Sequence, residues 1–299
     1  MSTPTPPQQA YAQPPAPQQA PQQGHGHRQP VPGGSYVSPI PVRETHLGDA
    51  LASEWTKIRS VRSTLWTLGV MAFLMLGIGL ATAAAVAGSD TSLENESALG
   101  LGFFGVLLGS ICVMTLGVLT IASEYGTGMI RTTLTACPAR GRVLAAKALV
   151  FFLLVFTMTT VLAALVGALQ TAMITDAVDP SGGEWLRSTV GVGLFVALIG
   201  LLALSVGAII RHSAGAITLM IGVMLLPLVA AMFMFSESLS GVRDFLLEYS
   251  IPSLLIGVYG EAAAGADAGP TGWQPVWIML GIAVAALIGA AVALNSRDV

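Results

Sequence analysis

The chain has 299 residues, of which 54% are hydrophobic and only 10% are charged, and its mean hydropathy is +0.74. Soluble domains usually carry about a quarter charged residues, so this composition excludes an ordinary soluble protein and is typical of several transmembrane helices. The formal net charge of −3 gives no indication of a nucleic-acid partner. The two cysteines, Cys112 and Cys137, are too few and too far apart for a disulfide framework or a zinc site, so we expect reduced thiols.

Residues 1–43 are predicted to form a disordered cytoplasmic tail. The first 41 residues hold eleven of the seventeen prolines and eight glutamines. Such a segment has too little apolar surface to offset the entropy lost on ordering. It also lacks the basic start, apolar centre and small-residue cleavage site of a signal peptide. His25 and His27 are flanked by glycines, a context that favours solvated side chains over a metal site.

Residues 44–64 are predicted to form an amphipathic helix at the membrane interface. Apolar residues recur every three or four positions, at Leu47, Leu51, Trp55, Ile58, Val61 and Leu65. This spacing defines one helical face. The opposite side carries polar and charged residues, with two arginines close by, namely Asp49, Ser53, Lys57, Ser60, Arg59 and Arg62. Tryptophan and basic side chains suit headgroup depth, and the helix runs directly into an apolar run, which favours the interface over a soluble helix that caps the bundle. The candidate functional residues of this helix are Glu54, Trp55, Lys57, Arg59 and Arg62.

Six apolar runs predict a transmembrane domain over residues 65–299. The runs are Leu65–Gly88, Leu99–Ala122, Leu149–Ala172, Val190–Ile210, Ala214–Phe235 and Val276–Leu294. Each is about 20 residues long, the length needed to cross about 30 Å of hydrocarbon. Only Arg211-His212-Ser213 separates the fourth run from the fifth, which is enough for a helical hairpin. The predicted fold class is therefore all-α, a polytopic membrane bundle of six transmembrane helices.

The distribution of lysine and arginine predicts the orientation of the six spans. With the amino terminus inside, eleven of the thirteen fall on the inner side, and only Arg187 and Arg243 lie outside. Acidic residues show the opposite bias. Because cytoplasmic loops carry the excess of lysine and arginine, both termini and the loop after the second span are predicted to be cytoplasmic. The expected location is a bacterial plasma membrane.

The outer segment, residues 236–275, contains short apolar pieces. Phe245-Leu246-Leu247 and the stretch from Ile251 to Tyr259, broken at Pro252, are too short to cross a bilayer. They are typical of re-entrant or surface-lying helices that cover the outer end of a bundle, with an ordinary ordered loop as the alternative.

The spans lack the groups that many functions require. No Asp, Glu, Lys, Arg or His lies well inside any of the six runs, which argues against an ion-coupled carrier. Small residues recur four apart, as at Gly105 and Gly109, and permit close helix approach within the bundle or at a subunit interface.

The sequence also argues against enzymatic chemistry. Lys57 and Lys147 follow Thr56 and Ala146, so neither belongs to the Gly-Lys of a phosphate-binding P-loop, and no H-E-x-x-H motif is present. We expect no catalytic residue, no metal site and no cofactor bound by this chain.

Residues 123–147 form the loop between the second and third spans and are here called the coupling loop. Glu124 directly follows apolar residues, where a carboxylate must face water, a partner cation or the positive start of a helix. Gly126 and Gly128 flank Thr127, which is predicted to cap a short helix. Ile130 and Leu134 share one face of that helix.

The second half of the coupling loop is predicted to be rigid. Arg131 lies on another face of the short helix, and Pro138 ends it. A new helix is expected to begin at Arg140 and to run through Lys147 into the third span. A short helix joined rigidly to two spans could transmit a push, whereas a flexible loop could not.

Two stretches carry a resemblance to a known family. They are L-A-S-E-W-T-K-I-R-S-V-R-S-T-L-W-T-L at Leu51–Leu68 and E-Y-G-T-G-M-I-R-T-T-L-T-A-C-P-A-R-G-R-V-L-A-A-K at Glu124–Lys147. Together with the six-span layout, they resemble the permease subunits of type-2 ABC transporters of actinobacteria, over about residues 44–299. The family's acidic residue, Gly-Thr, Pro-x-x-Arg and later Lys would correspond to Glu124, Gly126, Thr127, Pro138, Arg140 or Arg142, and Lys147. Cys137 and the long tail depart from the family's simplest pattern.

The resemblance implies a membrane permease subunit of an exporter. A separate cytoplasmic ATPase subunit would hydrolyse ATP and dock against the coupling loop and the interface helix. Two permease chains, identical or related, would form the path through the lipid bilayer. The slight polarity of the spans favours a hydrophobic or amphipathic cargo. The alternative is a membrane scaffold or assembly subunit that transports nothing.

Overall fold

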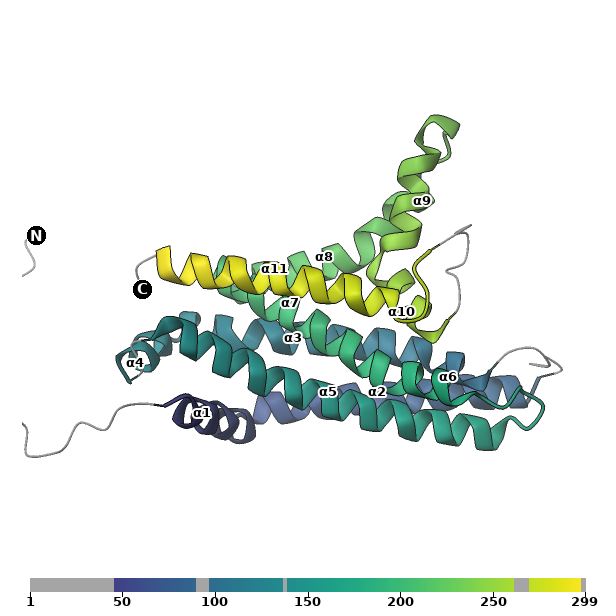
Figure 1. The fold of residues 1–299 in the computed structure, drawn as a ribbon, viewed down its shortest axis with the longest axis horizontal. Helices are drawn as coiled ribbons and strands as arrows, with labels where there is room; N and C mark the ends of the chain where they lie inside the picture. Colours follow the sequence, from purple (N-terminus) through teal and green to yellow (C-terminus); the bar gives the residue numbers. More distant parts are fainter. Residues whose placement is uncertain (1–45, 90–96, 137–138, 261–268, 297–299) are drawn as a thin grey trace, which may run out of the picture. The chain divides into compact units, whose positions relative to one another are not determined.

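The computed structural model describes residues 46–89, 97–136, 139–260 and 269–296 (Figure 1). The chain divides into two units, Met1–Glu44 and Thr45–Val299. The predicted tail, Cys137, Pro138 and both chain termini lie outside the described residues. All of the described residues belong to the second unit.

The described residues form helices and no strand, which confirms the predicted all-α class. Six helices are long and apolar enough to cross a membrane, as the sequence predicts. They comprise α2 (Arg62–Ala87), η1 with α3 (Ala98–Gly102 and Phe103–Gly126), α5 (Arg140–Met173), α6 to α7 (Gly182–Leu186, η2 at Arg187–Gly191, Val192–Ile210), α8 (Ser213–Met232) and α11 (Gln274–Ser296). The short helices are α1 (Leu47–Ser60), α4 (Met129–Ala136), η3 (Glu237–Leu239), α9 (Ser240–Tyr249) and α10 (Ile251–Tyr259).

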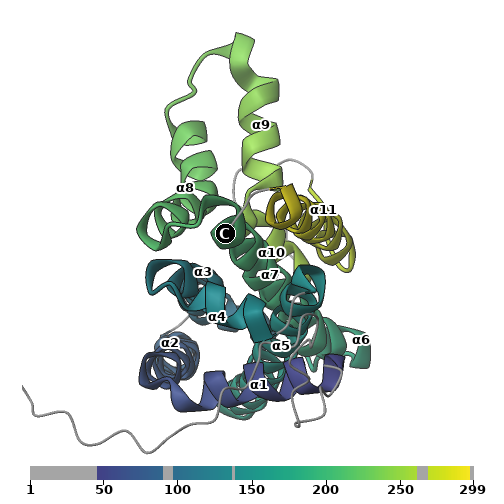
Figure 2. The ribbon, with the colours of Figure 1, turned by 90° about the vertical axis from the view of Figure 1, so that its left-hand side faces the viewer.

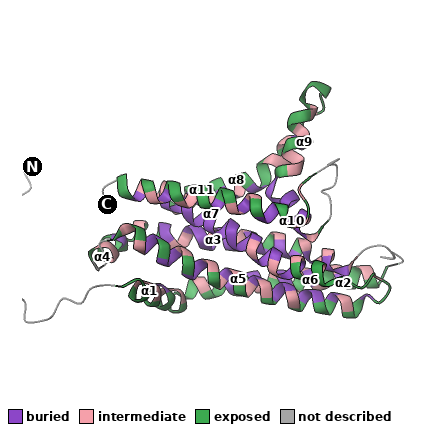
Figure 3. Cartoon of the chain, in the orientation of Figure 1, coloured by how far each residue is buried: buried purple, intermediate pink, exposed green. Residues whose placement is uncertain are grey.

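Helix α7 lies at the centre of the bundle. It packs against α3, α5, α8 and α11. Its most apolar window is 72% buried, against 22% for the corresponding windows of α2, α8 and α11 (Figure 3). The outer helices therefore leave most of their apolar side chains exposed or only partly buried, as expected of surfaces that face lipid.

Glycines set the closest helix contacts. A Cβ atom added at Gly105 of α3 would lie 2.8 Å from the Met75 carbonyl oxygen of α2. One added at Gly117 would lie 2.5 Å from the Gly200 carbonyl oxygen of α7. Backbone atoms cannot move aside for a methyl group at these distances. At Gly105, the small residue thus permits close packing between two helices of the same chain.

The connection between α7 and α8 is the predicted tight turn. Arg211 adopts the left-handed conformation, with φ 59°, and ends α7. His212 then caps α8, because its Nδ1 accepts a hydrogen bond from the Gly215 amide at 3.1 Å. Two residues are enough to reverse the chain here.

The segment between α8 and α11 contains two unlike helices. α9 has no buried residue, whereas Ile251, Leu254, Leu255 and Val258 of α10 are buried (Figure 3). The chain bends at Ser250, whose backbone is extended, and Pro252 lies in the first turn of α10. The prediction of a break at Pro252 is therefore wrong: proline lacks only an amide that a first turn leaves unused, so it starts this helix.

Candidate functional site

The site lies at one end of the bundle, here called the α4 end. It is formed by α1, α4, the last turn of α3 and the first turns of α5, all of which Figure 2 shows from the side of that end. α1 packs against α5 and α2, while α4 packs against α3 and α5. Three segments that are distant in sequence thus meet at this end.

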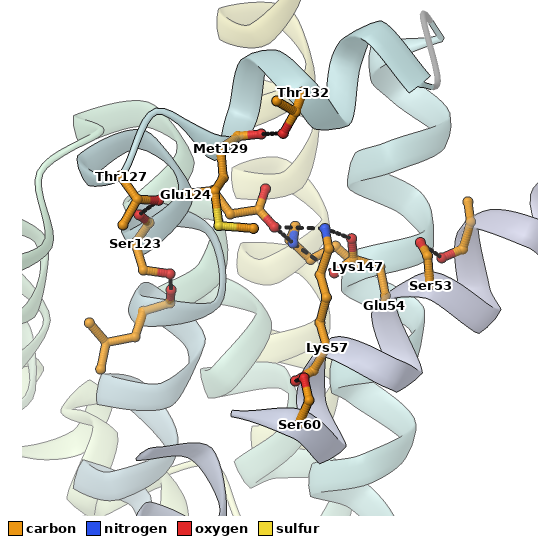
Figure 4. A network of polar contacts seen from close by, with 12 residues as sticks. Ser53, Glu54, Lys57, Ser60, Ser123, Glu124, Thr127, Met129, Thr132 and Lys147 are labelled. Atoms are coloured by element: carbon orange, nitrogen blue, oxygen red, sulfur yellow. Dashed lines mark hydrogen bonds and ion pairs between the residues drawn. The ribbon is translucent and has the colours of Figure 1, made fainter. Parts of the chain in front are cut away.

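Four charged side chains close a ring at this junction (Figure 4). Lys57 Nζ donates hydrogen bonds to Glu54 Oε1 at 2.7 Å and to Glu124 Oε1 at 2.9 Å. Lys147 Nζ donates to Glu54 Oε2 at 2.7 Å and to Glu124 Oε1 at 2.9 Å. Positive and negative groups alternate around this charge ring, and its formal net charge is zero. Both lysines of the chain belong to it.

Three members of the charge ring are buried. The side chains of Lys147, Glu54 and Glu124 are only 2%, 5% and 7% exposed, whereas Lys57 is 31% exposed. Charges taken out of water in this way are tolerated only when they are paired and hydrogen-bonded. The ring therefore holds α1, α3 and α5 in one arrangement, because loss of any buried member leaves an uncompensated charge.

Glu124 depends on its cation partners. It lies in the last turn of α3, where the helix dipole places partial negative charge and disfavours a carboxylate. The sequence allowed three environments for Glu124: water, a partner cation or the positive start of a helix. The structure shows two partner cations, Lys57 and Lys147. No sequence argument had identified Lys57 and Lys147 as those cations.

Lys57 lies at the exposed edge of the ring. Its partial burial would lower the pKa of its ammonium group. The hydrogen bonds and charges of Glu54 and Glu124 outweigh that effect and raise the pKa of Lys57 above 10.5. Lys57 is accordingly a permanent cation at physiological pH.

The inward side of α1 carries charged and apolar residues together. Leu51 and Ile58 of the predicted apolar face are half-buried, whereas Trp55 is 46% exposed and Leu47 45% exposed. Glu54 is the buried residue of this helix. Arg59 and Arg62 are exposed. The exposed Trp55 and Leu47 are compatible with the predicted interfacial position, while Glu54 and Lys57 supply half of the charge ring.

The remaining residues of the coupling loop lie around the ring and not in it. Arg131 is exposed on α4, and Gly126 is exposed near the end of α3. The Arg140 guanidinium donates a hydrogen bond to the Leu294 carbonyl at 2.7 Å, near the end of α11. A cation at a helix carboxyl terminus is favourable, so Arg140 joins α5 to the last span.

The predicted role of Thr127 as the cap of α4 is wrong. Thr127 is instead the residue that ends α3, and its hydroxyl donates a hydrogen bond to the Ser123 carbonyl at 2.8 Å. Gly128 follows with φ 71°, a conformation that favours glycine. The turn between α3 and α4 is thus made by the end of α3, and no side-chain cap of α4 is needed.

Two cavities flank the charge ring. One has a volume of about 240 Å³ and lies between α1, the start of α2 and the end of α3. The other, of about 260 Å³, lies between α1, α4 and the start of α5. Glu54, Lys57 and Met129 line both cavities, while Glu124 and Lys147 line the first.

Comparison with known proteins adds no family to this picture. The sequence matches no family model, and a search of curated proteins finds no match. The fold defines the class of this protein as a helical multi-pass membrane protein.

Proposed function

We propose that this chain is the permease subunit of an ABC-type exporter and that it is driven through the α4 end by a separate cytoplasmic ATPase subunit. The proposal rests on the resemblance of the interface helix and the coupling loop to that family and on one structural observation. The two spans that flank a short helix are joined to the helix preceding the first span by a ring of four charges, three of them buried.

The charge ring supports this proposal because it makes the α4 end rigid. α4 has an exposed face with Arg131, and both of its neighbouring spans are tied to α1 through Glu124 and Lys147. A force applied to α4 or α1 from outside would therefore reach α3 and α5 together. A loop without such bracing would absorb the same force by bending.

The proposed surroundings follow from the charge distribution. The α4 end carries most of the described lysines and arginines, so it is assigned to the cytoplasmic side of a bacterial plasma membrane, with both termini on that side. Six spans per chain favour a pair of permeases, as a homodimer or with a related chain. ATP is hydrolysed by the partner subunit, and this chain binds no cofactor.

The test is co-purification of the tagged full-length chain from its native host, followed by ATPase measurement in lipid vesicles. We expect a P-loop ATPase subunit to co-purify. We expect Arg131→Glu to lower complex-dependent ATP turnover by about tenfold. Reversing the charge of an exposed residue at a docking surface weakens binding of the partner subunit by about that factor. Arg243→Glu, an equally drastic change on α9, is the matched control and should retain wild-type turnover.

The outcomes are distinct. Absence of any ATPase subunit from the purified complex would contradict the proposal and favour the scaffold alternative. Full turnover in Arg131→Glu, with the ATPase present, would show that α4 is not the docking surface.

A further inference from the structure

The junction between α1 and α2 turns the chain into its first span. Val61, whose backbone is extended (φ −85°, ψ 111°), ends α1 and is followed directly by α2. Figure 2 looks along the spans and shows α2 end-on, whereas α1 lies across the view at the α4 end. A bilayer crossed by α2 in this direction places α1 along the membrane surface. The residues on either side of Val61 therefore lie at the depth of lipid headgroups.

One stripe of exposed residues runs down α2 from this junction. It consists of Arg62, Trp66, Val70 and Phe73, which are spaced by four, four and three residues and so share one face of the helix. Arg62 is exposed, and the side chains of Trp66 and Phe73 are 76% and 73% exposed. At 1.5 Å per residue, Trp66 lies about 6 Å and Phe73 about 16 Å beyond Arg62 along the helix.

The order of side chains along this stripe matches the profile of a bilayer leaflet. A cation at headgroup depth is followed by a tryptophan, which prefers the interface, and then by apolar side chains. A water-soluble partner could reach Arg62 but not Val70 or Phe73, which lie at hydrocarbon depth. The stripe therefore fits a lipid whose headgroup lies at Arg62.

The junction also carries two cations that the described structure leaves unneutralised. Arg59 and Arg62 are exposed, and neither guanidinium has a hydrogen bond or an ion pair among the described residues. The stretch from Trp55 to Phe73 contains no acidic residue. Its third cation, Lys57, is paired within the charge ring. The two arginines thus form a positive patch that attracts an anion.

The two arginines are close enough to serve one headgroup. They are three residues apart, a separation that even an extended chain spans in at most about 11 Å. Trp55 lies four residues before Arg59 on the same face of α1 and is 46% exposed. Each arginine therefore has an exposed tryptophan one helical turn away. Guanidinium groups bind phosphate oxygens through two parallel hydrogen bonds.

We propose that Arg59 and Arg62 bind the headgroup of an anionic phospholipid, of the phosphatidylglycerol class, at the junction of α1 and α2. The lipid phosphate accepts hydrogen bonds from the guanidinium groups, and an acyl chain lies along Trp66, Val70 and Phe73. A zwitterionic lipid is disfavoured, because its choline would add a third cation to the two arginines. This site is independent of the ATPase partner.

The first experiment needs no variant. The full-length chain in detergent is mixed with equal amounts of palmitoyl-oleoyl phosphatidylglycerol and the matching phosphatidylcholine, and bound lipid is counted by native mass spectrometry. The two lipids share their acyl chains and phosphate and differ in net charge. One arginine near an anionic surface favours binding by about fivefold, so two predict about 25-fold more phosphatidylglycerol than phosphatidylcholine. Equal retention of the two lipids would overturn the proposal.

Variants locate the site. Arg59→Gln and Arg62→Gln should each lower the preference for phosphatidylglycerol by about fivefold, and the double variant should lose most of it. Arg131→Gln is the matched control and should keep the wild-type preference. Arg131 is exposed at the same end and carries the same charge, but it lies on α4 and has no tryptophan one turn away. A double variant that melts at the wild-type temperature yet keeps the full preference would place the lipid elsewhere and overturn the proposal.

A third arm separates a lipid from a soluble phosphate. Glycerol 3-phosphate at millimolar concentration should not displace the bound phosphatidylglycerol, because it has no acyl chain to lie along the stripe on α2. Displacement would overturn the assignment of a lipid in favour of a free anion.

Discussion

The two ends of the bundle are held together by different means. At the α4 end, four buried or half-buried charges join three helices in a closed ring. At the opposite end, here called the α10 end, the described contacts between segments are neutral: Gln170 donates to the Gly79 carbonyl and Thr82 donates to the Leu101 carbonyl, both at 2.9 Å. The ion pair described there, Arg243 with Asp244, joins adjacent and exposed residues.

This difference indicates which end has one fixed geometry and which end can rearrange. A ring of paired charges has one good geometry, and a small displacement leaves charges without partners. Neutral hydrogen bonds within a membrane bundle are worth little individually and exchange partners easily. We therefore expect the α4 end to move as one body and the α10 end to open and close around it.

The largest effect should come from Lys147→Met. This substitution removes the most buried member of the charge ring and leaves two carboxylates with one half-exposed lysine. Removing one partner of a buried ion pair typically costs about 3–5 kcal/mol, so we expect a clear loss of stability in thermal unfolding of the detergent-solubilised protein. Arg59→Met, on the exposed side of α1, is the control and should change stability by no more than about 0.5 kcal/mol. Equal melting temperatures for the two variants would show that the ring does not hold the α4 end.

A smaller effect is expected at the α10 end from Gln170→Leu. The substitution removes the hydrogen bond to the Gly79 carbonyl, which then has only a share in the single Thr82 hydroxyl proton, because Thr82 Oγ1 lies 2.9 Å from both the Gly79 and the Leu101 carbonyl oxygens. It also removes a buried oxygen, Gln170 Oε1, that has no partner among the described residues. We expect a loss of about 0.6 kcal/mol, the average for such bonds in membrane proteins, in the same unfolding assay. A loss as large as that of Lys147→Met would erase the contrast between the two ends.

The smallest effect concerns alkaline pH. Because the pKa of Lys57 is higher in the folded protein than its ordinary value of 10.5, the stability that Lys57 contributes is fully present below that pH. The contribution is lost as the pH rises through the folded-state value. The difference in melting temperature between wild type and Lys57→Met should therefore be constant up to about pH 10 and shrink above it. Lys57→Arg stays charged at these pH values, so a matching decline in that variant would rule out Lys57 as the cause.

Most of the fold could be predicted because hydrophobic length dominates it. Runs of about 20 apolar residues specify spans whatever their neighbours are, and every span from Leu65 to Leu294 is present as a helix. Local turn chemistry was harder to predict. The Thr127 hydroxyl can cap the helix that follows it or bond to a carbonyl of the helix that precedes it. Pro252 can likewise end one helix or begin another. Tertiary packing decides between such options.

The site was predictable as a list of residues and not as an arrangement. Glu124 and Lys147 were singled out within the coupling loop, and Glu54 and Lys57 within α1, without any link between the two pairs. One signal was present: Glu54 and Lys57 are three residues apart and so share a helical face. That signal does not identify a partner 67 residues away in Glu124.

The length of α5 has a mechanical consequence. Its 34 residues correspond to a rod of about 51 Å, some 20 Å longer than the hydrocarbon it would cross. Lys147 holds this rod near one end, and Gln170 lies 23 residues further along. With Lys147 as the fulcrum, a tilt of only about 5° would displace Gln170 by about 3 Å, taking 1.5 Å of rise per residue. That displacement equals the length of the hydrogen bond from Gln170 to Gly79, so a movement too small to strain the charge ring could release the opposite end.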